Sequence, residues 1–142
     1  MLTVYPACFF QEHNGGYSVI FPDLNYLSTC GDSLDDAMEM AIDCLAGYIY
    51  TCQNDGDILP KPSKLNDIDP QKIASDIDPE SSVGEAFVNL ISIDVKAYAK
   101  EHFEKSVRKT LTIPAWLNNA ALEKNINFSQ TLQEALLTKI KA

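Results

Sequence analysis

The stretch KSVRKTLTIPAWLNNAALEKNINFSQTLQEALLTKI, residues 105–140, passes from a short alternating segment through a proline into two amphipathic segments. Side chains that alternate along a β-strand lie on opposite faces of it. The polar positions of the alternating segment are Arg108, Thr110 and Thr112, and the apolar positions are Leu111 and Ile113. The pattern predicts one strand with a polar, partly basic face and an apolar face.

Two helices are predicted after this strand. Pro114 suits a first helical position, where its missing N–H costs no hydrogen bond. The run Asn125-Ile126-Asn127 breaks the helical pattern, and Asn127 with Gln130 predicts a capping box for the second helix. The apolar positions at helical spacing are Trp116, Leu117, Ala120 and Ala121 in the first helix and Phe128, Leu132, Ala135 and Leu136 in the second. The order of one strand and two helices is that of a ribbon-helix-helix DNA-binding module.

A module of this size holds no core alone, and its lone strand has two open edges. We therefore expect a homodimer whose two strands pair into a ribbon that fits the DNA major groove. The free N–H groups where the second helix begins suit a phosphate. The predicted DNA-contacting residues are Lys105, Arg108, Lys109, Thr110, Thr112, Phe128 and Ser129, and the predicted dimer contacts are Leu111, Ile113, Leu117, Leu132 and Leu136. The competing interpretation is an ordinary α+β fragment.

Charge is divided unevenly along the 142 residues, whose net charge is −9. Residues 105–142 contain six basic and two acidic residues, a net of +4, which leaves five basic and eighteen acidic residues, a net of −13, for residues 1–104. The basic residues 105–142 suggest a nucleic-acid partner, and the acidic residues 1–104 suggest a cationic protein partner. Solubility alone is the other explanation of the acidic body.

The composition predicts a cytoplasmic protein without a metal or other cofactor. No apolar run approaches a membrane span, and the first residues lack a cationic leader. The cysteines have no zinc-ligand spacing, so reduced thiols are expected, and the two histidines are expected at the surface. These residues are Cys8, Cys30, Cys44, Cys52, His13 and His102.

The N-terminal part has the pattern of a small α+β domain. Strands are predicted over Leu2–Phe10, Tyr17–Phe21, Leu27–Cys30 and Ala86–Ile93, the last apolar enough to be covered on both faces. Ser33 and Asp36 predict a capping box for a long helix. Its apolar positions are Leu34, Ala37, Met38, Ala41, Leu45, Tyr48, Ile49 and Cys52, with Asp36, Glu39 and Asp43 opposite.

Residues 54–85 are rich in proline and aspartate, which predicts an irregular segment with one helical turn near Gln71–Ser75. Asp94–Phe103 predicts a short helix whose buried edge is Val95, Tyr98, Ala99 and Phe103. The expected architecture is β-β-β-α-β over residues 1–104, followed by the ribbon-helix-helix module over residues 105–142.

Residues 22–49, PDLNYLSTCGDSLDDAMEMAIDCLAGYI, resemble the signature of HicB antitoxins. The matching motifs are Pro22-Asp23-Leu24 and Gly31-Asp32-Ser33-Leu34-Asp35-Asp36-Ala37. The resemblance implies a partial ribonuclease-H-like fold for the N-terminal domain and a ribbon-helix-helix tail.

The same resemblance implies two roles: inhibition of a small basic HicA toxin that cleaves mRNA, and repression of the operon that encodes both proteins. An acidic surface that covers the toxin would exclude RNA phosphate from it. The predicted toxin-contacting residues are Glu12, Asp23, Asp32, Asp35, Asp36 and Glu39. Lys109 departs from the family by standing where an apolar inward residue is usual, and its side chain can snorkel or touch a phosphate.

Two alternatives remain at this stage. Active ribonuclease-H-like enzymes hold two metal ions with converging carboxylates, but most acids here fall at a helix start, on a solvent face or in the irregular segment, so we expect no enzyme. A stand-alone ribbon-helix-helix regulator with a ligand-sensing N-terminal domain is the second alternative. Sensing of a metal would need clustered His or Cys, which the sequence lacks.

Overall fold

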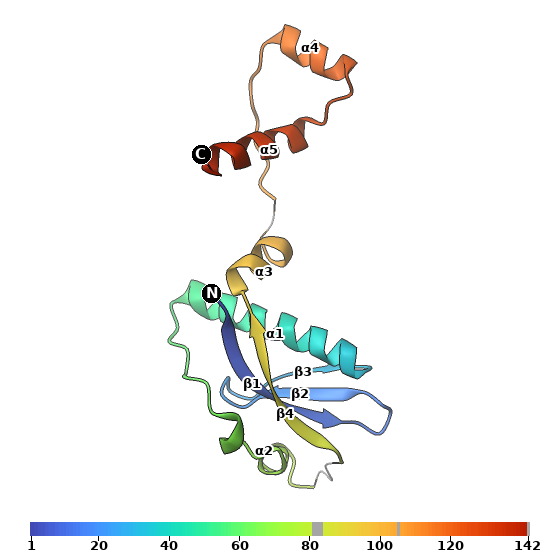
Figure 1. Ribbon diagram of the computed structural model, residues 1–142, viewed down its shortest axis with the longest axis vertical. Coiled ribbons are helices and arrows are strands. Elements are labelled where there is room, and N and C mark those ends of the chain that lie inside the picture. The colour runs from blue at the N-terminus through green and yellow to red at the C-terminus, as the bar shows by residue number, and fades with distance from the viewer. Residues whose placement is uncertain (81–83, 105, 142) are drawn as a thin grey trace. The chain divides into compact units, whose positions relative to one another are not determined.

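The computed structural model describes residues 1–80, 84–104 and 106–141. The chain divides into two compact units, Met1–Lys105 and Ser106–Ala142, called here the N-terminal and C-terminal units (Figure 1). The N-terminal unit contains strands and helices, and the described part of the C-terminal unit contains helices without strands.

The N-terminal unit is built on an antiparallel sheet of four strands in the order β3-β2-β1-β4. Phe9 of β1 lies opposite Val19 of β2 and Phe87 of β4, and the two phenyl rings stack with their centroids 4.9 Å apart. The strands are β1 (Thr3–Gln11), β2 (Tyr17–Phe21), β3 (Leu27–Gly31) and β4 (Ala86–Ile93). The fourth strand joins the same sheet as the first three and pairs with β1.

Two tight turns connect the first three strands. Glu12 N–H donates to the Gly16 carbonyl at 2.8 Å, which closes the β1–β2 turn. In the β2–β3 turn, Leu27 N–H donates to the Leu24 carbonyl at 3.1 Å. Asn25 and Tyr26 between them have φ of 56° and 57°. This is the pattern of a type I′ turn, in which glycine rather than tyrosine is the usual second central residue.

Helix α1 (Leu34–Asp55) covers one face of the sheet (Figure 1). Ser33 caps it, because its hydroxyl accepts from Asp36 N–H at 3.1 Å. The return bond of the predicted capping box is absent among the described residues, since the Asp36 carboxylate accepts from Asp32 N–H instead. At the other end Gly56 adopts φ of 73°, the left-handed conformation of a glycine helix cap. The helix buries Ala37, Ala41, Leu45, Ala46 and Ile49. The predicted apolar face is confirmed except at Leu34, which is 42% exposed because it occupies the first turn at the helix end.

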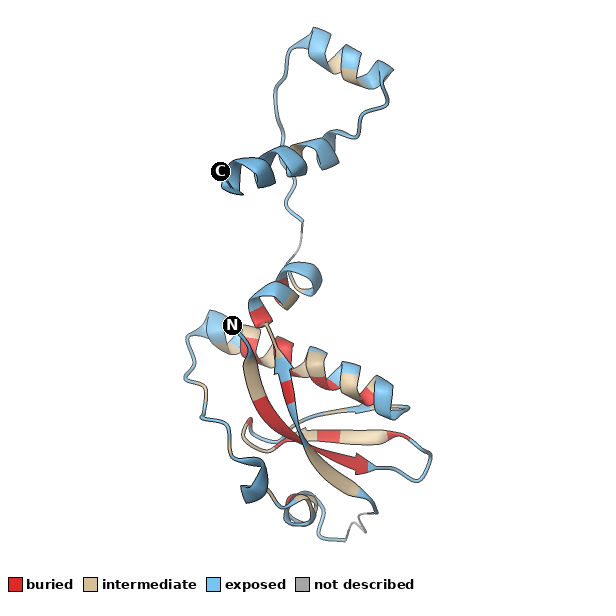
Figure 2. Cartoon of the chain, viewed as in Figure 1, coloured by how far each residue is buried: buried red, intermediate tan, exposed pale blue. Residues whose placement is uncertain are grey.

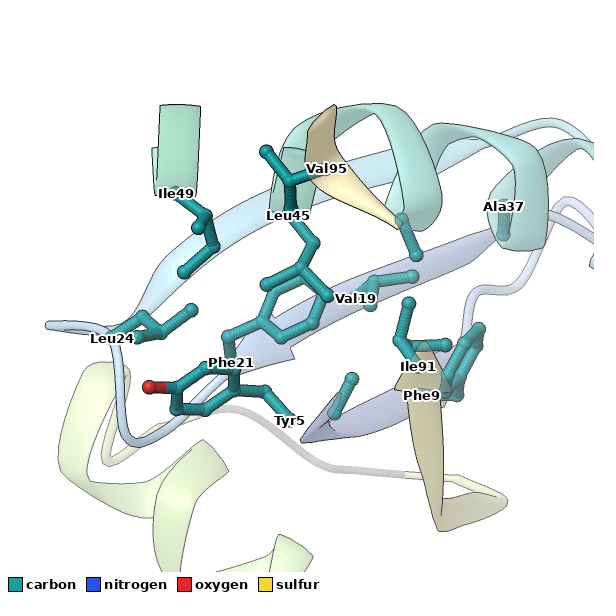
Figure 3. Packing of buried hydrophobic residues seen from close by; sticks show 12 residues of the cluster. Tyr5, Phe9, Val19, Phe21, Leu24, Ala37, Leu45, Ile49, Ile91 and Val95 are labelled. Carbon is teal, nitrogen blue, oxygen red and sulfur yellow. The ribbon is translucent and has the colours of Figure 1, made fainter. Parts of the chain in front are cut away.

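Strand β1 is buried on both faces, since it lies between two hydrophobic clusters (Figure 2). The larger cluster joins β1 and β2 to α1, and Phe9, Phe21 and Leu45 belong to it (Figure 3). The smaller cluster lies on the other face, where Cys8 and Phe10 meet Ile73. The expectation that β4 is covered on both faces is wrong: Asn89 and Leu90 are exposed, because β4 is an edge strand.

The segment between α1 and β4 crosses to the second face of the sheet. It contains a 3-10 turn, η1 (Leu65–Asp67), and helix α2 (Pro70–Ile77), which is longer than the single turn predicted. Asp69 accounts for this helix, because its carboxylate accepts from Gln71 N–H at 3.0 Å and caps the first turn. After β4, α3 (Val95–His102) buries Val95 and Ala99, as predicted.

The C-terminal unit contains α4 (Ala115–Glu123) and α5 (Phe128–Lys141). Pro114 is the residue before α4 rather than its first residue. Between the helices Asn125 has φ of 55°, and Ile126 N–H donates to the Ala121 carbonyl at 3.1 Å, which is a Schellman ending. Asn127 caps α5 through Gln130 N–H at 3.0 Å, but the Gln130 side chain donates to Glu134 and does not close the predicted capping box.

No strand forms in residues 106–113, where one was predicted. The physical reason is that a strand exists only through hydrogen bonds to a neighbouring strand, and the described part of this single chain offers none to this segment. The apolar residues of the unit are correspondingly exposed, among them Leu111, Ile113 and Trp116, the last at 71%.

Candidate functional sites

The tip of the β1–β2 hairpin lies against the junction between β3 and α1. A Cβ placed on Gly16 would stand 2.8 Å from the Gly31 carbonyl oxygen and 3.7 Å from Asp32 Cα. A Cβ on Gly31 would in turn stand 2.3 Å from the Ala37 backbone nitrogen. Both positions therefore require glycine for close backbone approach. This packing brings the predicted residues Glu12, Asp32, Asp35 and Asp36 to one end of the unit.

These four acids differ in what their carboxylates already bind. Asp36 accepts from Asp32 N–H at 2.8 Å, and Glu12 accepts from the Ser18 hydroxyl. The carboxylates of Asp32 and Asp35 accept no hydrogen bond among the described residues and are exposed. Acidic groups in a first helical turn are favoured by the helix dipole. We call Glu12, Asp32, Asp35 and Asp36 the acidic end.

Glu39 lies on α1 one turn beyond Asp35 and Asp36, where its charge also acts on Tyr98 of α3. Tyr98 of α3 donates its hydroxyl to the Asp43 carboxylate at 2.8 Å. The pKa of Tyr98 is raised to about 12, mainly by burial of its hydroxyl. The hydrogen bond to Asp43 and the nearby charges of Asp43 and Glu39 raise it further. The contact joins α3 to α1, and sequence reasoning missed the Asp43–Tyr98 pair because the two residues are 55 positions apart.

Asp23 stands apart from the other predicted toxin-contacting acids. It follows β2 at the end of the sheet opposite the hairpin tip, and its carboxylate accepts from both the backbone N–H and the hydroxyl of Ser63. The Tyr5 hydroxyl donates to the nearby Pro60 carbonyl. The structure gives Asp23 the role of holding residues 60–63 against the unit.

The predicted DNA-contacting residues are solvent-exposed wherever the structure describes them. Arg108, Lys109, Thr110 and Thr112 precede α4, and Phe128 and Ser129 form the first turn of α5. Lys105 lies outside the described residues. Of the predicted dimer contacts, Leu111, Ile113, Leu117 and Leu136 are exposed and Leu132 is partly buried.

The cysteines form no cluster with metal-ligating residues. Cys8 is buried, which raises its thiol pKa to about 11, and burial also raises the pKa of Cys44. Cys30 is exposed, and Cys44 and Cys52 are partly buried. Within residues 1–80, 84–104 and 106–141, no three His, Cys, Asp or Glu side chains gather as metal ligands. None of the helices in these ranges is both long enough and apolar enough to cross a membrane.

The chain thus joins an acidic α+β unit to a basic unit whose described part contains two helices. The sequence profile of the family described as HicB-like antitoxin of bacterial toxin-antitoxin systems matches residues 5–141. The chain belongs to this HicB-like antitoxin family, whose members are antitoxins and not enzymes.

The chain is also similar to individual proteins. Antitoxin HicB 1 of Photorhabdus laumondii is 37% identical over 76 residues, covering 51% of this chain and 49% of the relative, so the match spans about half of that curated protein. A solved toxin-antitoxin complex from Streptococcus pneumoniae contains a similar chain at 32% identity and a TM-score of 0.65, with 98% of this chain and 99% of that chain covered. The antitoxin HicB of Burkholderia pseudomallei gives 19% identity and a TM-score of 0.48 over 98% and 97% of the two chains.

Proposed function

We propose that this chain is the antitoxin of a HicA/HicB-type pair. The N-terminal unit binds a small basic HicA-like mRNA-cleaving toxin and blocks its RNA-binding surface, and the C-terminal unit binds the operator of the pair as a dimer. The observation that carries the proposal is the family match across residues 5–141 of a chain whose charge changes sign between its two units.

The acidic end supports neutralisation by occlusion. A protein that grips RNA presents cationic side chains to phosphate, and carboxylates on a complementary surface compete for the same groups. Asp32 and Asp35 are free to do so, whereas the Asp36 carboxylate is already bound to the chain. We propose that the toxin contacts Glu12, Asp32, Asp35, Asp36 and Glu39, with Asp23 acting through the fold instead.

The C-terminal unit supports the DNA-binding half of the proposal. Its apolar residues are exposed in a single copy, and a second copy would cover them while pairing residues 107–113 into a ribbon. Arg108, Thr110 and Thr112 would then face base edges, with Lys109 near phosphate. We propose a ribbon-helix-helix homodimer and autorepressor on this basis, with residues 1–104 as the partial ribonuclease-H-like domain.

The cytoplasm is the compartment we propose for the chain, because both partners, operator DNA and an mRNA-cleaving toxin, act there. The exposed Cys30 thiol agrees with a reducing environment. Neither a membrane nor a cofactor is part of the proposal.

Two paired assays test the two roles. Inducing the HicA-like protein encoded beside this chain should arrest growth, and co-expression of this chain should restore it. A reporter driven by the upstream DNA should be repressed by the chain. Growth arrest that persists while the chain is expressed and folded would reject the antitoxin role, and repression without any neighbouring toxin gene would favour the stand-alone regulator.

A further inference from the structure

A groove of about 400 Å³ lies between the β1–β2 hairpin and α2, on the sheet face opposite α1. Its lining is divided by chemistry. Apolar side chains from the sheet and α2 form the floor: Phe10, Ile20, Ala74 and Ile77. Carboxylates from three different segments, called here the acidic rim, stand around it: Glu12, Asp78 and Glu85.

The floor stays open because α2 covers this face only in part. Ile73 fills the space over Cys8 and Phe10, which completes the smaller hydrophobic cluster. Ile77, one turn further along α2, remains 50% exposed at the edge of the groove. An apolar surface of this kind gains stability when a partner's hydrocarbon atoms displace water from it.

No lysine or arginine of the described chain neutralises the acidic rim, and His13 is the one residue of the groove lining that can become cationic. Neither a Lys nor an Arg lines the groove. The two ion pairs found among the described residues involve Asp94 with the N-terminus and Glu101 with His102, so none involves the rim. Glu12 accepts a hydrogen bond from Ser18, and Asp78 accepts one from Glu80 N–H at 3.1 Å. These bonds orient the carboxylates without removing their charge.

We propose that this groove is a specific docking site for a lysine or arginine side chain of the toxin. The aliphatic stem would lie on Ile20, Ala74 and Ile77, and the cationic head would bind the rim carboxylates. Charge complementarity favours this occupant over an apolar one, because residues 1–104 carry a net charge of −13 and the groove contributes three carboxylates to it. The inference rests on the proposed antitoxin function and adds a site that the sequence did not single out.

The site test uses the full chain and the purified HicA-like protein encoded beside it. The rim variant carries Glu12→Gln, Asp78→Asn and Glu85→Gln. The matched control removes three exposed acids outside the groove, Asp55→Asn, Asp57→Asn and Glu101→Gln. Both variants therefore have the same net charge. We expect the rim variant to bind toxin at least tenfold more weakly, with a smaller dependence of affinity on salt, and the control to change affinity less than threefold.

A second variant tests the floor without changing charge. Ile77→Ser removes apolar surface from an exposed position, so it should weaken toxin binding while circular dichroism and operator binding stay unchanged. Equal losses in the rim variant and its control would mean long-range attraction and would overturn the groove assignment, as would unchanged binding by the rim variant. If the unmodified chain does not bind the toxin, the proposed function itself fails.

Discussion

The Asp23 carboxylate accepts two hydrogen bonds from Ser63, one from its backbone N–H at 2.7 Å and one from its hydroxyl. Asp23→Ala removes both bonds and should lower the free energy of unfolding by about 2 kcal/mol, whereas Ser63→Ala removes one and should cost about 1 kcal/mol. Urea denaturation measures both. Asp32→Ala is the control, since the Asp32 side chain accepts no described hydrogen bond. If the Asp23→Ala variant is as stable as the unmodified chain but binds the toxin weakly, Asp23 contacts the toxin directly.

Tyr26 occupies a left-handed position in the β2–β3 turn and is 44% exposed. That conformation costs a non-glycine residue about 1–2 kcal/mol. Glycine at this position avoids that cost but loses more backbone entropy on folding. Tyr26→Gly should therefore raise the free energy of unfolding by about 0.5–1 kcal/mol. Tyr26→Ala keeps the conformational cost and should give no such gain. Thermal unfolding of the two variants compares them, and a less stable glycine variant would contradict the turn assignment.

Tyr98 predicts a specific loss of stability at high pH. Its pKa is raised from 10.0 to about 12 by burial and by the bond to Asp43, so the folded state keeps a proton that the unfolded state loses over this range. The stability that protonated Tyr98 contributes to the fold is fully present below pH 10 and is lost as pH rises toward 12. Tyr98→Phe should be less stable by about 1 kcal/mol at neutral pH and should lose less stability between these pH values.

The control for this titration is Tyr50→Phe. Tyr50 packs on Phe103 and donates no hydrogen bond from its hydroxyl among the described residues. Other groups with raised pKa, such as Cys8, contribute equally to both variants. Parallel pH profiles for Tyr98→Phe and the unmodified chain would therefore show that the Asp43 contact has no such linkage.

Neighbouring residues of the proposed ribbon should respond differently to the same new charge. Leu111→Glu places a carboxylate on the apolar face of the ribbon and should break both the dimer and operator binding. Thr112→Glu places it on the opposite face and should abolish operator binding while the dimer persists. Analytical ultracentrifugation and a gel-shift assay separate the two results. A monomer in both variants, or in neither, would contradict the alternation of residues 108–113.

Arg108 is the single arginine of the chain. If its guanidinium binds a guanine through two hydrogen bonds, Arg108→Ala should weaken operator binding by about 1–3 kcal/mol and relax specificity at one base pair. Toxin binding should be unaffected. Lys124→Ala, at the exposed end of α4, is the basic control. Uniform weakening on every DNA sequence would instead make Arg108 a phosphate contact.

The sequence predicts the elements whose signals are local. The alternating strand patterns, the Ser33 cap and the spacing of Ala41 and Leu45 correctly predict the order of strands and α1. The length of α2 was underestimated because one cap, Asp69, stabilises it within a proline-rich segment. Contacts that join distant segments, such as Asp23 with Ser63, leave no pattern at either position.

The candidate sites also divide into those with a local signal in the sequence and those formed by distant segments. Acids clustered along the sequence, Asp32 with Asp35 and Asp36, come together because they share a helix start. The acidic rim was not predicted as a group, because Glu12, Asp78 and Glu85 meet only when α2 packs on the sheet. For the proposed ribbon, the alternation of residues 108–113 is visible in the sequence, but no strand forms there in the single chain. We propose that its pairing needs a second chain.

The most direct test of the account is purification of this chain, tagged and expressed from its own locus, with mass spectrometry of the proteins that accompany it. The account predicts a small basic protein at near-equal stoichiometry that cleaves RNA once it is separated from the chain. Recovery of the chain alone, still bound to its upstream DNA, would contradict the antitoxin role and leave a regulator whose N-terminal unit has another ligand.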